Sequence, residues 1–534
     1  MAVFFIALVA LGIATSADYG QPWDEPWEQD ILRLNGNQYA AAFGLEGRFA
    51  MRSDMPAPCS GLIADSEERD HGECAYYPLL WLMDAQTISE PTRMLIWHAY
   101  TWLLFVGGAA ALWLICRRLS LSPLLSSVAT LLLVLSPRMF AEGHYNNKDV
   151  VLLSLVLATV WLALRLMERP TPMRAIWFSL AGAAAANTKI IGLLVWGLCA
   201  LFVLFRQIAG RNMRKHVWVA AGTALVAFCG FYLLLTPAMW GDPPGYLRYV
   251  LQTATDFTRW QNFVLFRGTI FHLKYSRLPR YYLPYMILVT TPLWALALVL
   301  LGQVCAIGRW LRRKSAPLRD DQAMALMLCS LLWLVPLLYV VIAQPTTYNG
   351  WRHFYFLYGP MLVLAAYGLR CAFVWLAARK SQWPRRVAAG LLALCMGATG
   401  AGIAINHPNQ YAYYNCLITG KDLPGYLELD YWNVSVLETL NTLLAQVPED
   451  QSLTVTGSEY WSHTGLKYAM PLLSPADQAR VRVLPLGSLG ADYMLVNSTY
   501  AVLGYWRPSA VQTVAVETQS YGVPLCRVYH RNDR

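Results

Sequence analysis

Two adjacent carboxylates, Asp24 and Glu25, lie a few residues beyond the first apolar run, in the acidic segment 23–30. Carboxylates at that depth are expected near the boundary between lipid headgroups and water. Burial there raises a carboxyl pKa and makes the side chain a usable proton acceptor. Pro26 favours a helix over 27–43, with Asp24 and Glu25 at its positive end. Solvated surface charge is the alternative interpretation of this cluster.

A second set of residues offers positive charge on the same side of the predicted membrane. Five cations flank the ends of apolar runs, beside polar or aromatic residues that include His353: Arg138, Lys148, Lys189, Arg280 and Arg352. Such cations often only extend to lipid headgroups, and that interpretation suits Arg248 and Arg259 on an interfacial helix. A convergent cationic pocket would instead suit a phosphate whose tail lies in the bilayer.

Carboxylate and cations together predict one reaction. An acceptor hydroxyl attacks a sugar carried on a polyprenyl phosphate, the carboxylate takes the proton, and the cations stabilise the departing phosphate. Direct displacement on one face inverts the anomeric centre. The sequence contains no Walker loop, no convincing dinucleotide fingerprint and no Cys/His spacing typical of structural zinc, so no cofactor is expected.

Long apolar runs must position these residues. The chain has 534 residues, of which 56% are hydrophobic and only 14% charged, whereas an average soluble domain is about a quarter charged. This composition excludes a disordered chain, a coiled coil and an ordinary cytosolic enzyme. Runs near the roughly 20 residues needed to cross a bilayer predict an all-α polytopic membrane protein with about eleven transmembrane helices. They fall at 3–17, 94–116, 120–138, 149–167, 174–188, 190–208, 217–237, 283–304, 323–343, 359–378 and 387–405.

The membrane orientation follows from where the basic residues lie. The chain has a net charge of +10, and its basic residues gather in alternate links between the runs. These clusters include Arg117 and Arg118, Arg206 to Lys215, Arg309 to Arg319, and Arg379 to Arg386. Basic links favour the cytoplasmic side, so we expect a cytoplasmic N-terminus, an extracytoplasmic C-terminus and no nucleic-acid partner. Residues 1–17 have no basic start, which favours an uncleaved helix over a signal peptide.

The chain is expected to form two domains. Residues 1–405 form a transmembrane domain with large outer loops at 18–93 and 239–283, and residues 406–534 form a small α/β domain. The latter contains a helical pattern over 434–447 and short strand patterns at 453–456, 493–496, 511–516 and 524–529. Four cysteines fall outside the membrane, which permits Cys59–Cys74 and Cys416–Cys526 disulfides, with free thiols as the alternative.

Four stretches resemble the GT-C superfamily of membrane glycosyltransferases, most closely the bacterial relatives of protein O-mannosyltransferases that use phospholipid-linked sugars. They are Asp24 with Glu25, residues 136–149 (SPRMFAEGHYNNKD), residues 345–360 (PTTYNGWRHFYFLYGP) and residues 406–435. The resemblance implies Asp24 as the base, Glu25 as an assisting residue, and Arg138, Lys148 and Arg352 near the donor phosphate. It also implies a membrane-facing donor groove and an active site on the outer face.

The chain departs from these relatives at Asn349, where several carry Asp. It also has no sign of the three-fold repeat domain found in eukaryotic protein mannosyltransferases. The outer loops contain no Asp-x-Asp metal motif apart from the related stretch Glu428-Leu429-Asp430, so a divalent metal is not expected. The expected partners are a polyprenyl-phosphate-linked sugar, an acceptor hydroxyl on a glycan, lipid or protein, and membrane lipids, in a bacterial inner membrane. A transporter or flippase and a non-catalytic assembly protein are the alternatives; the nearly charge-free span middles argue against transport.

Overall fold

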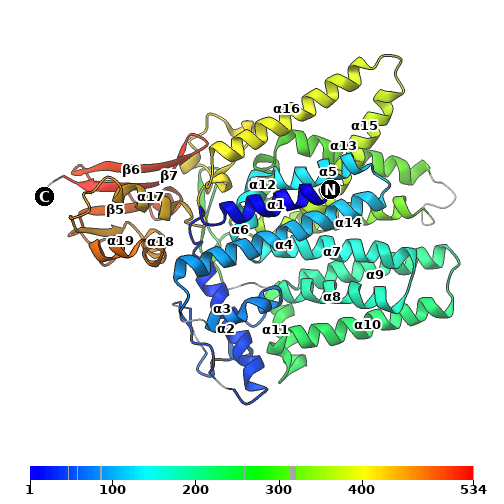
Figure 1. Ribbon diagram of the computed structural model, residues 1–534, viewed down its shortest axis with the longest axis horizontal. Helices are drawn as coiled ribbons and strands as arrows, with labels where there is room; N and C mark the ends of the chain where they lie inside the picture. Colours follow the sequence, from blue (N-terminus) through cyan, green and yellow to red (C-terminus); the bar gives the residue numbers. More distant parts are fainter. Residues whose placement is uncertain are drawn as a thin grey trace.

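The structure is a computed structural model that describes residues 1–532 except 46, 54, 57, 85, 86, 256, 258 and 313–319. Long helices pack side by side, and a small α/β unit lies at one end of the bundle together with α2 and α3 (Figure 1). The α9–α10 and α15–α16 links lie at the opposite end. Arg313, Lys314 and Arg319, which belong to one of the predicted cytoplasmic clusters, lie outside the described residues.

Sixteen helices precede the α/β unit in the described part of the chain, and their arrangement confirms a mostly helical polytopic fold. They are α1 Ala2–Thr15, α2 Glu25–Ala41, α3 Leu80–Asp84, α4 Glu90–Arg118, α5 Pro123–Val134, α6 Pro137–Tyr145, α7 Asp149–Glu168, α8 Pro172–Thr188, α9 Ile191–Ala209, α10 Lys215–Leu235, α11 Pro243–Thr255, α12 Tyr282–Thr290, α13 Leu293–Arg312, α14 Asp321–Ala343, α15 Tyr358–Ala377 and α16 Trp383–Ile405. The short 3₁₀ helix Arg352–Leu357 (η5) leads directly into α15.

Every predicted apolar run coincides with a helix, but fewer than eleven helices are long enough to cross a bilayer unaided. Among the described residues, eight helices have the required length and apolar composition, or nine if α5 and α6 form one bent span. Helices α1 and α8 contain only 14 and 17 residues. The predicted span 283–304 divides into α12 and α13 at Pro292, which cannot donate a backbone hydrogen bond.

The break between α5 and α6 shapes the end of the bundle at which the α/β unit lies. The two helices differ in direction by 72°, and Pro137 occupies the first position of α6. Proline is favoured at this position because the first helical N–H groups have no partner within the helix. As a result, α6 turns across the end of the bundle and carries Arg138 and Glu142 there.

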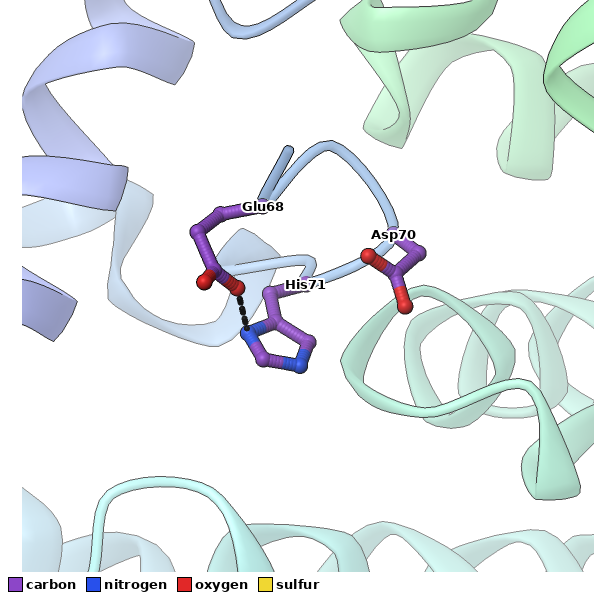
Figure 2. A group of neighbouring side chains, drawn as sticks. All are labelled: Glu68, Asp70 and His71. Carbon is purple, nitrogen blue, oxygen red and sulfur yellow. Dashed lines mark ion pairs between the residues drawn. The ribbon is translucent and has the colours of Figure 1, made fainter. Parts of the chain in front are cut away.

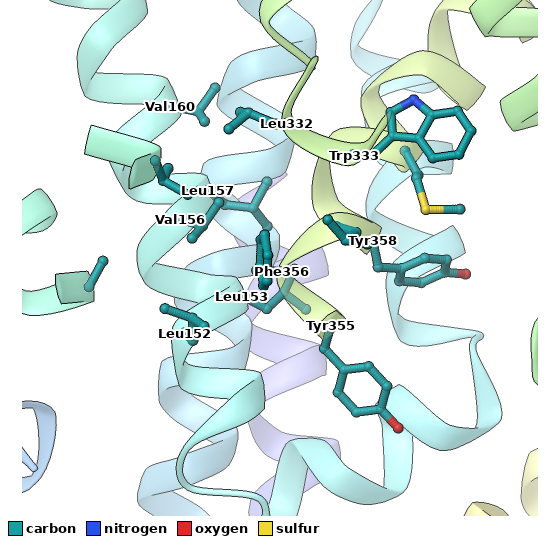
Figure 3. Packing of buried hydrophobic residues seen from close by; sticks show 14 of the residues in the cluster. Leu152, Leu153, Val156, Leu157, Val160, Leu332, Trp333, Tyr355, Phe356 and Tyr358 are labelled. Carbon is teal, nitrogen blue, oxygen red and sulfur yellow. The ribbon is translucent and has the colours of Figure 1, made fainter. Parts of the chain in front are cut away.

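Helix α7 packs against the segment that bears Arg352. Figure 3 shows Leu153, Val156 and Leu157 of α7 beside Phe356, within one large buried cluster. Gly359 makes this approach possible, because a Cβ there would lie 2.7 Å from the Leu157 Cδ2 atom. The end of η5 and the start of α15 are therefore held in place by apolar packing against α7.

The C-terminal unit contains a five-stranded sheet in the order β4-β3-β5-β7-β6. Strand β3 pairs in parallel with β4 and β5, whereas β7 runs antiparallel to both β5 and β6. The strands are β3 Leu453–Gly457, β4 Val481–Val483, β5 Tyr493–Asn497, β6 Gln512–Ser520 and β7 Val523–Arg531, and the helices are α17 Ser435–Leu444, α18 Tyr460–Ala469, α19 Pro475–Arg480 and α20 Ser498–Leu503. This confirms the predicted α/β unit, including its four predicted strands; β4 and helices α18 to α20 were not predicted.

The segment between α16 and the α/β unit packs on both parts. Ile418 and Leu427 join the large cluster of the helices, whereas Ala412 and Leu429 pack against Leu525 of β7. A hairpin of β1 Phe263–Phe266 and β2 Thr269–His272 occupies the second outer loop, where no strand was predicted. All eleven cysteines are free, so neither of the two possible disulfides forms.

Candidate active site

Asp24 lies immediately before α2, close to the segment 406–434 that links α16 to the α/β unit. The backbone N–H of its neighbour Trp23 donates to the Trp432 carbonyl at 3.2 Å, which fixes the start of the helix against this segment. The Asp24 Oδ2 atom accepts a hydrogen bond from Arg352 Nη1 at 3.1 Å. Its side chain is 21% exposed, so the carboxylate remains accessible to a ligand.

Arg352 is the centre of the cluster. It follows Asn349 and Gly350, which both have a positive φ and turn the chain into η5. Besides Asp24, its guanidinium donates to the Tyr431 hydroxyl at 3.0 Å and lies 4.8 Å from the centre of the Trp432 ring. The Arg352 Nε atom is buried and has no hydrogen-bond partner among the described residues. One donor of this guanidinium is thus available to a ligand.

Lys189 and His353 extend the cluster through Asp149. Lys189 forms an ion pair with Asp149, whose other oxygen lies 3.8 Å from Arg352 Nη1. The Lys189 ammonium also lies 3.2 Å from His353 Nδ1, and because an ammonium can only donate, this nitrogen must accept. The proton of the neutral ring is therefore on Nε2, which is buried and has no partner in the described part of the chain. His353 thus offers a second available donor.

Lys148 lies in a neighbouring group of opposite charges. It forms an ion pair with Glu28, and Asn147 donates to Glu73 at 3.3 Å. Burial and the Glu28 charge raise the pKa of Glu73 well above its ordinary value, whereas Lys148 offsets the burial of Glu28 and lowers the pKa of that carboxyl. The Lys148 charge is thus paired with a carboxylate of the protein, that of Glu28.

Three predicted site residues lie apart from the Asp24–Arg352 pair. Glu25 is fully buried and accepts hydrogen bonds from His98 Nε2 at 2.8 Å and from Gln29 at 3.1 Å, so it faces the protein interior. Arg138 is buried, and its guanidinium lies 4.5 Å from the centre of the Tyr411 ring. Arg280 is exposed in the turn before α12. The structure therefore brings together Asp24, Lys189, Arg352 and His353, with Lys148 nearby through its own ion pair.

Sequence reasoning missed Asp149 and Tyr431 as members of this site. Asp149 is the residue at which a long apolar run begins, directly after Lys148, and this position beside a predicted site residue was the available signal. Tyr431 is part of the Glu-Leu-Asp-Tyr-Trp stretch, which contains several polar and aromatic types but no spacing that identifies one of them.

A third charged group, Glu68, Asp70 and His71, lies at the edge of the first outer loop (Figure 2). One ligand atom from each residue lies within 4.8 Å of the others, a spacing that would suit a metal ion. Glu68 is already paired with His71 at 2.8 Å, and Arg259 is paired with Glu68 at 2.8 Å and Asp70 at 2.7 Å. Although burial opposes ionisation, His71 and Arg259 lower the pKa of Glu68 to about 2. Arg259 is thus an ion-pair partner of this loop, which corrects its assignment to lipid headgroups.

A pocket of about 210 Å³ adjoins the cluster on the side of the α/β unit. The outer loops contribute Trp23, Trp260 and Asn349, and the C-terminal half contributes Tyr431 and Trp461. The rings of Trp23 and Trp461 lie 4.6 Å apart, and Trp260 stacks on Tyr348 at 4.0 Å. Because Tyr431 also bonds Arg352, the pocket is directly connected to the ion-pair cluster.

The electrostatics of the cluster suit a base next to an anion site. Burial raises the pKa of Asp24, and Arg352 opposes this shift without cancelling it. A carboxylate with a raised pKa accepts protons more readily at neutral pH, while the available N–H groups of Arg352 and His353 suit anionic oxygens. The arrangement can therefore accept a proton and stabilise a phosphate at neighbouring positions.

The chain matches no protein-family model and no curated protein. It is similar to solved structures over nearly its whole length. ArnT from Cupriavidus metallidurans, solved with undecaprenyl phosphate bound, is 13% identical over 99% of this chain and 97% of that chain, with a TM-score of 0.44. The oligosaccharyltransferase of Archaeoglobus fulgidus is 12% identical over 98% and 75%, with a TM-score of 0.49. The arabinofuranosyltransferase AftD from Mycobacteria is 14% identical over 99% and 41%, with a TM-score of 0.44.

Identities of 12–14% reflect a distant likeness, so the roles of individual residues rest on the geometry of this chain alone.

Proposed function

We propose that the protein is a membrane glycosyltransferase that moves a sugar from a polyprenyl phosphate to an acceptor hydroxyl. The acceptor oxygen forms a bond to the anomeric carbon while the bond from that carbon to the phosphate oxygen breaks. Asp24 receives the hydroxyl proton, and the phosphate leaves with the electron pair, so the anomeric centre inverts. Arg352, Lys189 and His353 stabilise the charge that develops on the phosphate.

The contact between Asp24 and Arg352 carries this proposal. It joins a partly exposed carboxylate of raised pKa to a cation that begins η5, at the end of a helix long enough to cross a membrane. Chemistry at this depth suits a donor whose phosphate lies at the membrane surface while its polyprenyl chain remains in the bilayer. The motif resemblance to phospholipid-dependent glycosyltransferases points to the same donor class.

The experiment that tests the proposal uses purified protein in liposomes with a panel of undecaprenyl-phosphate sugars. We expect one of these donors to be consumed, with release of undecaprenyl phosphate. The Asp24→Asn variant should turn over at least 100-fold more slowly, because the substitution removes a general base and hardly changes side-chain volume.

Asp84→Asn provides the matched control. This carboxylate belongs to the same outer loop and forms an exposed ion pair with Arg48 at 2.9 Å, outside the cluster. It should retain turnover within about twofold, since exposed pairs contribute little. Full turnover by the Asp24→Asn variant, or consumption of none of the donors, would contradict the proposed function.

A further inference from the structure

The pocket beside the cluster has properties that the proposed base and phosphate site do not explain. Three of its lining residues carry an N–H donor that is buried and has no hydrogen-bond partner in the described part of the chain: Trp23 Nε1, Trp260 Nε1 and Asn349 Nδ2. Asn349 itself is only 2% exposed. Buried polar groups in folded proteins are almost always hydrogen-bonded. Three such donors in one pocket indicate a bound group that is rich in oxygen atoms.

The charges of the pocket argue against an anionic ligand. Among its described lining residues there is no lysine, arginine or histidine, and the titratable acids are Glu428 and Glu459. Burial raises the pKa of Glu428 to about 8, so this carboxyl is neutral at pH 7. Glu459 instead accepts the N–H groups of Trp461 and Ser462, both at 2.7 Å, at the start of α18. A phosphate would therefore have no cation to pair with among these lining residues. The carboxylate of Glu459, which could pair with a cationic ligand, already accepts two backbone N–H groups.

The pocket is also lined by aromatic side chains. Trp23, Trp260, Tyr431 and Trp461 present rings from both sides of the pocket. A pyranose ring has apolar C–H faces that pack on aromatic rings, and an edge of hydroxyl and ring oxygens that accept hydrogen bonds. Flat apolar walls combined with unpaired N–H donors and no basic residue therefore suit a neutral sugar.

We propose that this pocket binds a neutral sugar ring of the acceptor, so that the acceptor is a glycan. The inference rests on the proposed function and specifies its second substrate. Tyr431 lines the pocket and bonds Arg352, which bonds Asp24 and approaches Asp149, the partner of Lys189. The pocket and Lys189 thus lie at opposite ends of one series of contacts. An inverting displacement needs the attacking hydroxyl and the departing phosphate on opposite sides of the anomeric carbon.

The test measures sugar binding without catalysis. Purified protein in detergent is titrated with methyl pyranosides of neutral hexoses and pentoses and with their disaccharides, and binding is followed by saturation-transfer NMR. At least one of these probes should bind saturably, whereas inorganic phosphate should not compete with it. Trp260→Phe removes one N–H and keeps an aromatic ring, and Asn349→Asp replaces a donor while tolerating the positive φ. Each variant should weaken binding at least fivefold.

Trp506→Phe is the matched control, because this tryptophan packs on Tyr529 of the α/β unit and does not line the pocket. It should bind the sugar within twofold of the unaltered protein. The absence of saturable binding by every neutral probe, or unchanged binding by both pocket variants, would overturn the inference.

Two further results separate the pocket from the proposed function. Asp24→Asn should retain sugar binding, so binding without any transfer would refute the function but not the pocket. A polyprenyl-phosphate sugar should bind together with the pyranoside. Competition between them would assign the pocket to the donor sugar and would overturn the acceptor assignment.

Discussion

Asp24 experiences two opposing influences, and their balance gives a pH prediction. Burial raises its pKa and the Arg352 charge lowers it, with a net upward shift. Because only the ionised carboxylate can accept a proton, kcat/KM should fall on the acid side with an apparent pKa above the value of about 3.9 for an ordinary Asp.

Arg352→Gln tests this balance directly. Without the cation, Arg352 no longer opposes the rise that burial causes in the Asp24 pKa, so the acid limb of the pH profile should move to higher pH. The kcat should also fall by about 100-fold, because the stabilisation of the phosphate is lost. A pH–rate profile of each variant measures the two effects separately. A lower kcat with an unmoved acid limb would show that Arg352 does not set the pKa of Asp24.

Glu428 gives a second prediction from its protonation state. Its pKa of about 8 results mainly from burial, so at pH 7 the side chain is a neutral carboxyl of nearly the same shape as glutamine. Glu428→Gln should therefore change turnover less than threefold at pH 6–7. Above pH 8 the unaltered protein acquires a buried charge that the variant lacks, so the two profiles should separate there. Profiles that coincide up to pH 9 would contradict the raised pKa.

At the scale of elements, helices α13 and α15 approach each other through two glycines. A Cβ on Gly302 would lie 1.8 Å from the Leu364 carbonyl oxygen, and one on Gly368 would lie 2.5 Å from the Gly302 nitrogen. Small residues allow membrane helices to pack at backbone contact. Since α15 continues from η5, this contact also helps to hold Arg352 in place.

Gly302→Ala should consequently destabilise the protein. Overfilling a packed interface typically costs about 1–3 kcal/mol, which thermal unfolding in detergent would detect as a lower Tm. Gly308→Ala on the same helix is the control, since a Cβ there meets nothing within 4 Å among the described residues. Equal Tm values for the two variants would contradict backbone contact between α13 and α15.

At the scale of the whole molecule, the site and the α/β unit share one end of the bundle, which we expect to be extracytoplasmic (Figure 1). Cys59 and Cys416 are exposed, free thiols in segments that we expect on the extracytoplasmic side, whereas Cys229 lies within α10. A membrane-impermeant maleimide applied to intact spheroplasts should label Cys59 and Cys416. The double variant Cys59→Ser, Cys416→Ser should lose this label. Labelling that appears only after lysis would reverse the predicted orientation.

Much of the architecture follows from local sequence. Hydropathy identified every helical run of the bundle, because a segment surrounded by lipid must be apolar and must satisfy its backbone hydrogen bonds internally. Four of the five strands of the α/β unit follow from short β-branched stretches in the same way, whereas the three-residue strand β4 does not. Whether α1 and α8 cross the bilayer alone does not follow, since length and neighbouring helices decide this together.

The sequence by itself determined which residue types are available at the helix ends predicted to be outer: a carboxylate before α2, cations before α7 and α9, and a cation at the start of η5. Only the tertiary structure decided which of them meet. Asp24 and Glu25 are adjacent in the chain, but successive helical residues point about 100° apart, so one can face Arg352 while the other faces His98. Asp149 and Tyr431 lie far from Asp24 along the chain, and only long-range packing brings all three to the same guanidinium.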